Sequence, residues 1–417
     1  MKMLKWLPCL LILAQPLQAA TLADLQHEAV TNRQVLDRYQ ADISISRLNE
    51  QNARSSWYPT VDFKYTINQL DDDSLFENSE NSRASGVVSW NVFSGFRDQA
   101  LIRSAELMQR VADYKLAMIR QDIMLNVALR YLAIYQRQAS LQVADDFYQT
   151  LLKVYRDGEN RFQVGLIKKS DLLKFKVDLD DAEISLKKAR AEVDKSIKLL
   201  GREIGGEVDS ATLDFSIMSQ PLNPVDPVEG DLKMIENRSE LKVLRLLTEA
   251  TEYQAKAEHS RLYPRVDFAT SYSTFDDDYL ATSTAQEDTE LRAQLILTMN
   301  LYDGSRGKNQ EEKALLEMVK YRSDLTELTS DLRVALRNLF LDFAVNSDNI
   351  GAALAGVGQA EENLRVTRLS YQEGLSRESE LLDAAANLSR ARYNAVAART
   401  ETYRTWFMIQ RALEQFE

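Results

Sequence analysis

Cysteine is almost missing from this sequence. The 417 residues include one, Cys9, which lies within an apolar run near the amino end. If Cys9 is removed together with that run, the mature chain has no thiol and therefore no disulfide scaffold, no cysteine nucleophile and no thiolate metal site. Histidine is nearly as rare, because His27 and His259 are the only two. Two histidines cannot build a histidine cluster, so we expect neither a metal site nor a cofactor.

Proline and glycine are also scarce, with 7 and 14 residues, which is few for this length. Long hydrophobic runs are missing as well: past residue 20 no stretch approaches the ~20 apolar residues of a membrane-spanning helix. Positive charge is in the minority, with Lys+Arg 51 against Asp+Glu 63. Nucleic-acid-binding proteins depend on basic surfaces, so this balance predicts no nucleic-acid partner.

The first residues of the chain have the pattern of a secretory signal peptide. Lys2 and Lys5 lead an apolar run from Leu7 to Ala14, and Gln18–Ala20 supplies small residues for cleavage. Cys9 lies inside the run rather than after it, which disfavours a lipoprotein. Removing residues 1–20 takes away two lysines and no acid, so the net charge changes from −12 to −14. We therefore predict an exported, cysteine-free mature protein.

What the sequence does contain is an internal duplication. Tyr58–Phe63 and Tyr263–Phe268 both read Tyr-Pro-x-Val-Asp-Phe, 205 residues apart. At an offset of 209 residues, Phe93-Ser-Gly matches Tyr302-Asp-Gly, and Phe162–Leu166 matches Tyr371–Leu375. Such ordered echoes indicate two copies of one unit. We predict a first repeat over residues 21–205, a polar linker over 206–229 and a second repeat over 230–417.

Most of each repeat has helical patterning. Apolar residues from Leu172 to Val193 follow each other at gaps of 3 and 4, which is the heptad spacing of coiled coils. Residues 381–398 repeat this spacing. Two further segments, from Arg97 to about Asp157 and from Arg306 to about Leu369, are helical in pattern and contain no proline. Some 60 residues at 1.5 Å each make ~90 Å, so we expect long helical hairpins.

Four shorter segments alternate apolar and polar residues, as amphipathic β-strands do. The apolar positions are Val61, Phe63, Tyr65 and Ile67 in the first, Val88, Trp90 and Val92 in the second, Val266, Phe268 and Tyr272 in the third, and every second residue from Leu291 to Leu301 in the fourth. Strands of this length span a bilayer when tilted. A small sheet packed on helices is the other interpretation. Export and the length of the helices favour a membrane barrel, which four strands can close only by oligomerising.

These residues resemble the TolC-type outer membrane factors of Gram-negative bacteria over essentially the whole mature chain. The motifs that carry the resemblance are the duplicated Tyr-Pro-x-Val, the turns at Gly95 and Gly304, and the Gly-Leu segments followed by Asp/Glu-Leu-Leu. The resemblance implies a mainly α protein with a β-barrel portion. In that fold three subunits give four strands each to one twelve-stranded transmembrane barrel, continued by an α-helical tunnel through the periplasm.

The resemblance also implies function and sites. The protein is expected to be a passive exit duct, a homotrimer in outer membrane lipid. It is expected to work with a periplasmic adaptor (membrane fusion protein) and an inner-membrane transporter of the ABC or RND type, for small-molecule efflux or type I secretion of proteins. Glu380 and Asp383 match an acidic gate, and three residues apart they share a helix face. The remaining matched positions are Asp171, Tyr371 and Arg377 in a latch, and Gly165, Leu166, Gly374 and Leu375 in adaptor-contacting tips.

The sequence departs from the family at the latch, where the arginine expected two residues after Gly374 is Ser376, with Arg377 beside it. Alternatives stay open for the other positions too. Glu380 and Asp383 also fit a solvated helix face, and Gly165 and Gly374 also fit plain turn glycines. A periplasmic adaptor is the second functional hypothesis, although it would show one hairpin between Gly-rich β-domains. No catalytic set or phosphate loop is visible in the sequence, so an enzyme is not expected.

Overall fold

The computed structural model describes residues 20–73, 78–223, 226–280 and 289–416. The predicted signal peptide, apart from its last residue, lies outside them. Contacts divide the chain into two compact units. We call residues 20–36, 119–238 and 332–416 the hairpin unit, and residues 37–118 and 239–331 the strand unit. Two very long helices, α3 (Arg97–Gln163) and α7 (Arg306–Gln372), contribute residues to both units.

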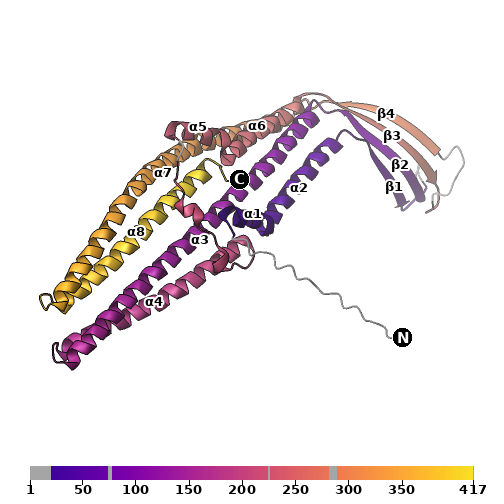
Figure 1. The fold of residues 1–417 in the computed structure, drawn as a ribbon. Helices are drawn as coiled ribbons and strands as arrows, with labels where there is room; N and C mark the ends of the chain where they lie inside the picture. The colour runs from indigo at the N-terminus through magenta and orange to yellow at the C-terminus, as the bar shows by residue number, and fades with distance from the viewer. Residues whose placement is uncertain (1–19, 74–77, 224–225, 281–288, 417) are drawn as a thin grey trace, which may run out of the picture. The chain divides into compact units, whose positions relative to one another are not determined.

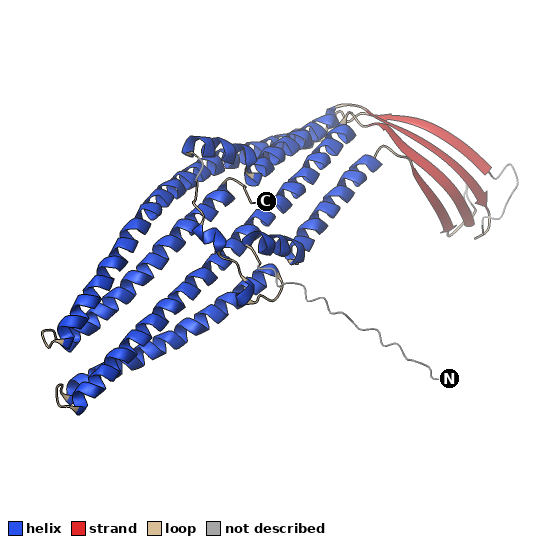
Figure 2. Ribbon diagram, in the orientation of Figure 1, coloured by secondary structure: helices blue, strands red, loops and turns tan. Residues whose placement is uncertain are grey.

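The hairpin unit consists of two long helical hairpins and several short elements (Figures 1 and 2). The first hairpin joins α3 to α4 (Lys169–Ile204), and the second joins α7 to α8 (Glu378–Ala412). The short elements are α1 (Leu22–Asn32), two 3-10 turns at Ser210–Thr212 and Ser216–Ser219, and α5 (Pro227–Asn237). The turns at the tips of the two hairpins lie 209 residues apart in the sequence, as the repeat predicts. The helices α3 and α7 each extend beyond the predicted end, to Gln163 and Gln372.

Local sequence explains where these helices begin and end. Thr21 caps α1: its Oγ1 accepts from the Asp24 N–H at 3.3 Å, while the Asp24 carboxylate accepts from the Thr21 N–H at 3.0 Å. Asp226 caps α5 through the N–H of Val228 at 3.0 Å. The helix α4 ends at Gly205, whose φ of 75° lies in the left-handed region that glycine enters most readily.

The hairpins pack through small apolar clusters. Near the tips, Val154, Phe175, Tyr371 and Leu381 form one buried cluster. The next cluster joins Leu151, Leu179, Ala182 and Ala385. Phe175, Leu179, Ala182 and Leu381 belong to the heptad positions read from the sequence, so the predicted coiled-coil seam is confirmed. Both clusters contain residues of both hairpins, and the seam therefore joins the hairpins as well as the helices within each.

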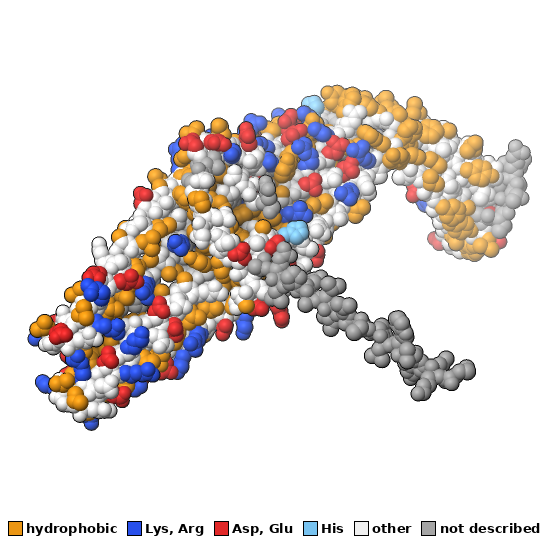
Figure 3. Space-filling view, in the orientation of Figure 1, with side chains coloured by type: hydrophobic (Ala, Val, Ile, Leu, Met, Phe, Trp, Pro, Cys, Tyr) orange, Lys and Arg blue, Asp and Glu red, His pale blue; other side chains and the backbone are white. Residues whose placement is uncertain are grey.

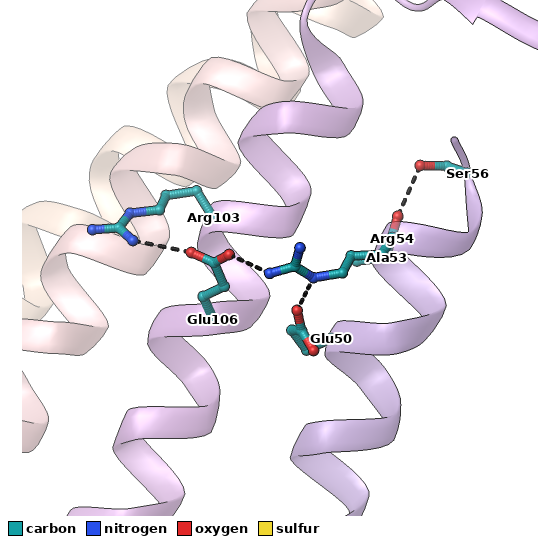
Figure 4. A network of polar contacts seen from close by, with 6 residues as sticks. All are labelled: Glu50, Ala53, Arg54, Ser56, Arg103 and Glu106. Carbon is teal, nitrogen blue, oxygen red and sulfur yellow. Dashed lines mark hydrogen bonds and ion pairs between the residues drawn. The ribbon is translucent and has the colours of Figure 1, made fainter. Parts of the chain in front are cut away.

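The strand unit contains one antiparallel sheet in the order β1-β2-β3-β4. Its strands are β1 (Thr60–Gln69), β2 (Glu80–Phe93), β3 (Arg265–Asp276) and β4 (Thr289–Thr298). Helices α2 (Val35–Ser55) and α6 (Ser239–His259), with a 3-10 turn at Ser260–Leu262, lead into β1 and β3. In α2, Arg54 forms ion pairs with Glu50 and with Glu106 of α3, at 2.8 Å for the latter, and Glu106 also accepts from Arg103 at 3.0 Å (Figure 4). This network fastens α2 to α3 just before β1 begins.

Register confirms that the predicted apolar positions share one face of the sheet. Val61 lies opposite Val88, Gly86 opposite Tyr272, and Phe268 opposite Leu295, and directly paired residues project to the same side. Many of these side chains are exposed in the single subunit, with Phe63 at 77% and Leu295 at 71%. Hydrophobic side chains gather over the strands in Figure 3, whereas charged ones are distributed over the helices.

Two details of the strands differ from the sequence-based prediction. A β-bulge between Asn91 and Phe93 brings Phe93, not Val92, opposite Val266. There the Asn91 side-chain amide donates to the Asp267 carboxylate at 2.7 Å. The strand β4 ends at Thr298, three residues before the end of the alternating pattern, because Asn300 accepts from the Tyr302 N–H at 3.1 Å and starts a turn.

Candidate functional site

The tips of the two hairpins have the same backbone structure. Gly165 and Gly374 have φ values of 77° and 75°, which confirms them as turn glycines. Leu166 N–H donates back to Arg161 O at 2.8 Å, and Leu375 N–H donates to Ser370 O at 2.8 Å, as in a Schellman motif. The two leucines are 70% and 83% exposed. The four predicted tip residues therefore form two matching turns, and each turn exposes an apolar leucine side chain.

Two of the predicted acidic residues hold the starts of α4 and α8. Asp171 and Glu380 lie 209 residues apart, at the third position of their helices. The Asp171 carboxylate accepts from the Lys168 N–H at 3.4 Å, and the Glu380 carboxylate accepts from the Arg377 N–H at 3.4 Å. Both therefore occupy the acidic position of a capping box. This capping role is compatible with the latch and gate roles that the sequence predicts.

Ser376, the residue in place of the latch arginine, has a partner of its own. Its hydroxyl donates to the Glu380 carboxylate at 2.7 Å. This hydrogen bond, together with that from the Arg377 N–H, holds the pKa of Glu380 below its ordinary value. Arg377 contributes its backbone and a nearby positive charge, and its side chain is exposed. Within the described residues, no hydrogen bond or ion pair joins the Arg377 side chain to Asp171 or Tyr371.

Tyr371 is buried between the hairpins, with 8% of its surface exposed. Its ring meets Phe175 edge-to-face at 6.3 Å between centroids. Burial raises the pKa of the Tyr371 phenol, and the Asp171 carboxylate adds to the rise. The structure brings these two latch candidates into one neighbourhood without a hydrogen bond between them: the Tyr371 hydroxyl has no partner among the described residues.

Asp383 belongs to a wider acidic group than the sequence indicated. Burial raises the pKa of Asp178, and the negative charges of Asp181 and Asp383 raise it further. Asp178 comes from the first hairpin and Asp383 from the second. The described residues contain no set of three or more His, Cys, Asp or Glu arranged to hold a metal ion. The group is therefore a concentration of negative charge and not a built coordination site.

Sequence reasoning missed Arg161, whose side chain joins the two hairpin tips. Arg161 of α3 donates to Tyr371 O at 3.3 Å and to Gln372 O at 2.9 Å, and its guanidinium lies 4.8 Å from the Tyr371 ring centroid. It lines a pocket of about 270 Å³ between the hairpins. The sequence offered one signal for this residue. Arg161 directly precedes the motif Phe162–Leu166, whereas Ser370 precedes the matching motif Tyr371–Leu375 in the second repeat.

Two ion pairs also cross between the hairpins. Lys174 of α4 meets Glu378 of α8 at 3.1 Å. Farther from the tips, Arg392 of α8 pairs with Asp146 of α3 at 2.9 Å, and with Glu361 of α7 at 2.8 Å. These side chains are partly exposed, and each such pair contributes ~0–1 kcal/mol. Together with the two apolar clusters they hold the hairpins side by side (Figure 1).

Helices suited to crossing a bilayer are lacking in the described part of the chain, since none is both long enough and apolar enough. The fold is that of a duplicated protein of long helical hairpins with one four-stranded amphipathic sheet. The sequence pattern of the outer membrane efflux protein family matches it twice, over residues 25–206 and 233–414. The chain belongs to this family, and it is an outer membrane protein.

Named relatives agree with this assignment. The chain is 22% identical over 401 residues to outer membrane protein TolC of Escherichia coli (strain K12), covering 92% of this chain and 80% of that one. It is 22% identical over 353 residues to the cobalt-zinc-cadmium resistance protein CzcC of Cupriavidus metallidurans, covering 82% and 79%. The solved structure of outer membrane protein VceC from Vibrio cholerae has the same fold, with a TM-score of 0.82, 15% identity and coverage of 94% and 95%.

Proposed function

We propose that this protein is the outer-membrane exit duct of a tripartite export system and has no enzymatic activity. The observation that carries the proposal is the four-stranded sheet with one exposed apolar face and two open edges, β1 and β4. An open edge in lipid leaves backbone amides unpaired at several kcal/mol each. Three copies joined edge to edge, β1 to β4, form a closed barrel of twelve strands with the apolar face outward. Family membership weighs against the adaptor hypothesis.

The hairpin tips suit the periplasmic end of such a duct. Leu166 and Leu375 are exposed apolar side chains at turns where an adaptor is expected to dock, and an exposed apolar group of this kind favours a protein partner. The adaptor in turn links the duct to an ABC or RND-type transporter in the inner membrane. We propose that Glu380 and Asp383 form acidic rings at this end, which favour cations over anions, and that Asp171, Tyr371 and Arg377 lie at the latch between hairpins.

The test combines assembly with conduction. The full chain is expressed, the mature protein is purified from outer membranes in detergent, its native mass is measured, and it is inserted into planar lipid bilayers. We expect three copies per particle and a low, cation-selective conductance. The double variant Glu380→Ala/Asp383→Ala is expected to lose much of this selectivity, with Glu373→Ala, an exposed acid beyond the end of α7, as the matched control. A protein that stays soluble without detergent, or that inserts without conducting, contradicts the proposal.

A further inference from the structure

The polar face of the four-stranded sheet carries an uneven set of charges. If three subunits close a barrel, as proposed above, this face lines the lumen, and the inference below therefore rests on the proposed function. Alternation and register place on it the basic residues Lys64, Arg83, Arg265 and Arg292 and the acidic residues Asp62, Asp267 and Glu290. Asp62 and Lys64 are neighbours on this face of β1 and have opposite signs. The described strands thus leave one positive charge per subunit on the polar face.

Ion pairs identify Arg83 as the source of this surplus. Arg265 pairs with Asp267 at 2.8 Å, and Arg292 pairs with Glu290 at 2.6 Å. Both pairs join residues two apart on one strand, so each is neutral within a single strand. Among the described residues, no carboxylate forms an ion pair with Arg83. Its charge is therefore the one that the polar face does not compensate.

The Arg83 guanidinium is held in place without being neutralised. Its Nη2 donates to Ser273 Oγ at 3.0 Å, and its Cζ lies 4.9 Å from the ring centroid of Phe275. Ser273 is 1% exposed, so its hydroxyl is a fixed acceptor beneath an exposed arginine. A hydroxyl and an aromatic ring orient a cation and leave its charge intact. Arg83 thus presents a positive charge at a defined position.

Arg83 lies near the loop end of the sheet. It is the fourth residue of β2, which begins at Glu80, and it lies opposite Thr66 of β1 and Phe275 of β3. The long helices α3 and α7 follow the other ends of β2 and β4. In the proposed duct those helices extend into the periplasm, so the loop end is the outer exit. Arg83 would therefore lie in the outer part of the barrel lumen.

Acidic residues at the strand tips do not cancel this charge. Asp71–Asp73 begin five residues beyond Thr66, which is ~17 Å along an extended strand and exceeds the Debye length of ~8 Å at physiological salt. The two acids after β3 precede Tyr279, whose carbonyl accepts from the Tyr65 hydroxyl at 2.7 Å. Tyr65 belongs to the apolar face, so this contact draws the tip of β3 toward the outside of the barrel and away from Arg83.

We propose that Arg83 is a specificity-determining residue, which forms a ring of three positive charges near the outer end of the duct. Rings of basic side chains favour anions. This ring is opposite in sign to the acidic residues proposed for the periplasmic end, Glu380 and Asp383. Anions are concentrated at the outer end, and small cations meet an electrostatic barrier there. The cation selectivity of the whole duct is then a balance between its two ends.

Reversal potentials in a potassium chloride gradient test this balance. Arg83→Gln removes the charge and keeps a hydrogen-bonding side chain, so the ratio of potassium to chloride permeability should rise roughly twofold at ~0.1 M salt. The rise should vanish near ~1 M salt, where the Debye length falls to ~3 Å. Arg83→Lys keeps the charge and should retain the wild-type ratio. Asp62→Asn removes a negative charge from the same face and should lower the ratio.

A second measurement uses tripolyphosphate, a small polyanion, as a probe for the ring. Added to one side of the bilayer at a time, it should reduce the current of the wild type and of Arg83→Lys from the outer side. Arg83→Gln should lose most of this block. Trimers of Arg83→Gln that conduct with an unchanged permeability ratio, or that tripolyphosphate still blocks as in the wild type, overturn the inference. A wild-type chain that forms no conducting trimer overturns the proposed function instead.

Discussion

Two acidic residues at the hairpin tips cap helices, a role that the sequence alone cannot distinguish from the predicted gate and latch roles. Glu380 was predicted from its position as a gate residue, and the structure shows that the same carboxylate also caps α8. Asp171 caps α4 in the same way. An acid three positions after a helix start suits both roles, so residue type and spacing alone leave them indistinguishable. The role of Ser376 could not be predicted at all, because its hydrogen bond to Glu380 depends on loop geometry that no motif encodes.

The Ser376 hydroxyl gives a prediction about pH. Hydrogen bonds from Ser376 and from the Arg377 N–H lower the pKa of Glu380, so its negative charge persists as the pH falls below the ordinary glutamate pKa of about 4.3. Ser376→Ala removes the larger cause, the Glu380 pKa rises, and cation selectivity is lost at a higher pH than in the wild type. Reversal potentials measured between pH 7 and pH 3 report this shift. Ser379→Ala, beside Glu380 on α8, should follow the wild-type curve, and coinciding curves for both variants would refute the assignment.

Gly95 gives a second residue-scale prediction, in the turn from β2 to α3. Gly95 and Gly304 are equivalent in the repeats and have φ values of 67° and 70°, which cost other residues ~1–2 kcal/mol. A Cβ at Gly95 would also lie 2.8 Å from Ser260 O and 2.8 Å from Tyr263 Cβ, whereas Gly304 has open space. We expect Gly304→Ala to lose about 1–2 kcal/mol and Gly95→Ala roughly 1–3 kcal/mol more. Thermal unfolding in detergent compares them, and equal losses count against this account.

At the scale of elements, periodicity predicted much of the fold and missed local irregularity. The heptad positions of α4 and α8 and the apolar face of the sheet were readable because each depends only on a repeating pattern. The bulge at Asn91–Phe93 was not readable, because it depends on the contact of Asn91 with Asp267, 176 residues away in the chain. The contacts of Arg161 with α7 were hidden for the same reason: they cross 210 residues and follow no period.

The two faces of β4 predict opposite outcomes for one kind of substitution. Leu295 lies on the apolar face with 71% exposure, and Gln294 lies beside it on the other face. An arginine on the lipid face of a barrel costs ~2–4 kcal/mol at the bilayer midplane, whereas a lumen position tolerates it. Leu295→Arg should therefore lower the amount of assembled protein in outer membranes, and Gln294→Arg should not. The amounts of the two variants in isolated outer membranes are compared. Equal amounts would contradict a position of the sheet in the membrane.

The whole molecule is a duplication whose halves are equivalent in backbone but different in contacts. Helices begin and end at matching positions 209 residues apart, from Arg97 and Arg306 to Gln163 and Gln372. The side chains between the hairpins differ, so Tyr371 is buried while its equivalent Phe162 is 38% exposed. A face that is covered in one repeat and open in the other is what a ring of two alternating junctions requires. This asymmetry is what the proposed ring of subunits predicts, since the open face of one subunit would be covered by the next.

This equivalence predicts which residues of neighbouring subunits face each other. Because Lys174 meets Glu378 within a subunit, their equivalents Asp383 and Lys169 should meet between subunits. Lys169→Cys/Asp383→Cys, treated with a short thiol cross-linker, is expected to give covalent dimers and trimers on denaturing gels. The control Lys174→Cys/Glu378→Cys has the same number of thiols at the same level of the hairpins, and it should give monomers alone. The position of each cross-link is fixed by the order in which the hairpins follow one another around the ring. Covalent dimers and trimers from the control, or none from the Lys169→Cys/Asp383→Cys variant, would therefore mean that the hairpins do not alternate around a ring.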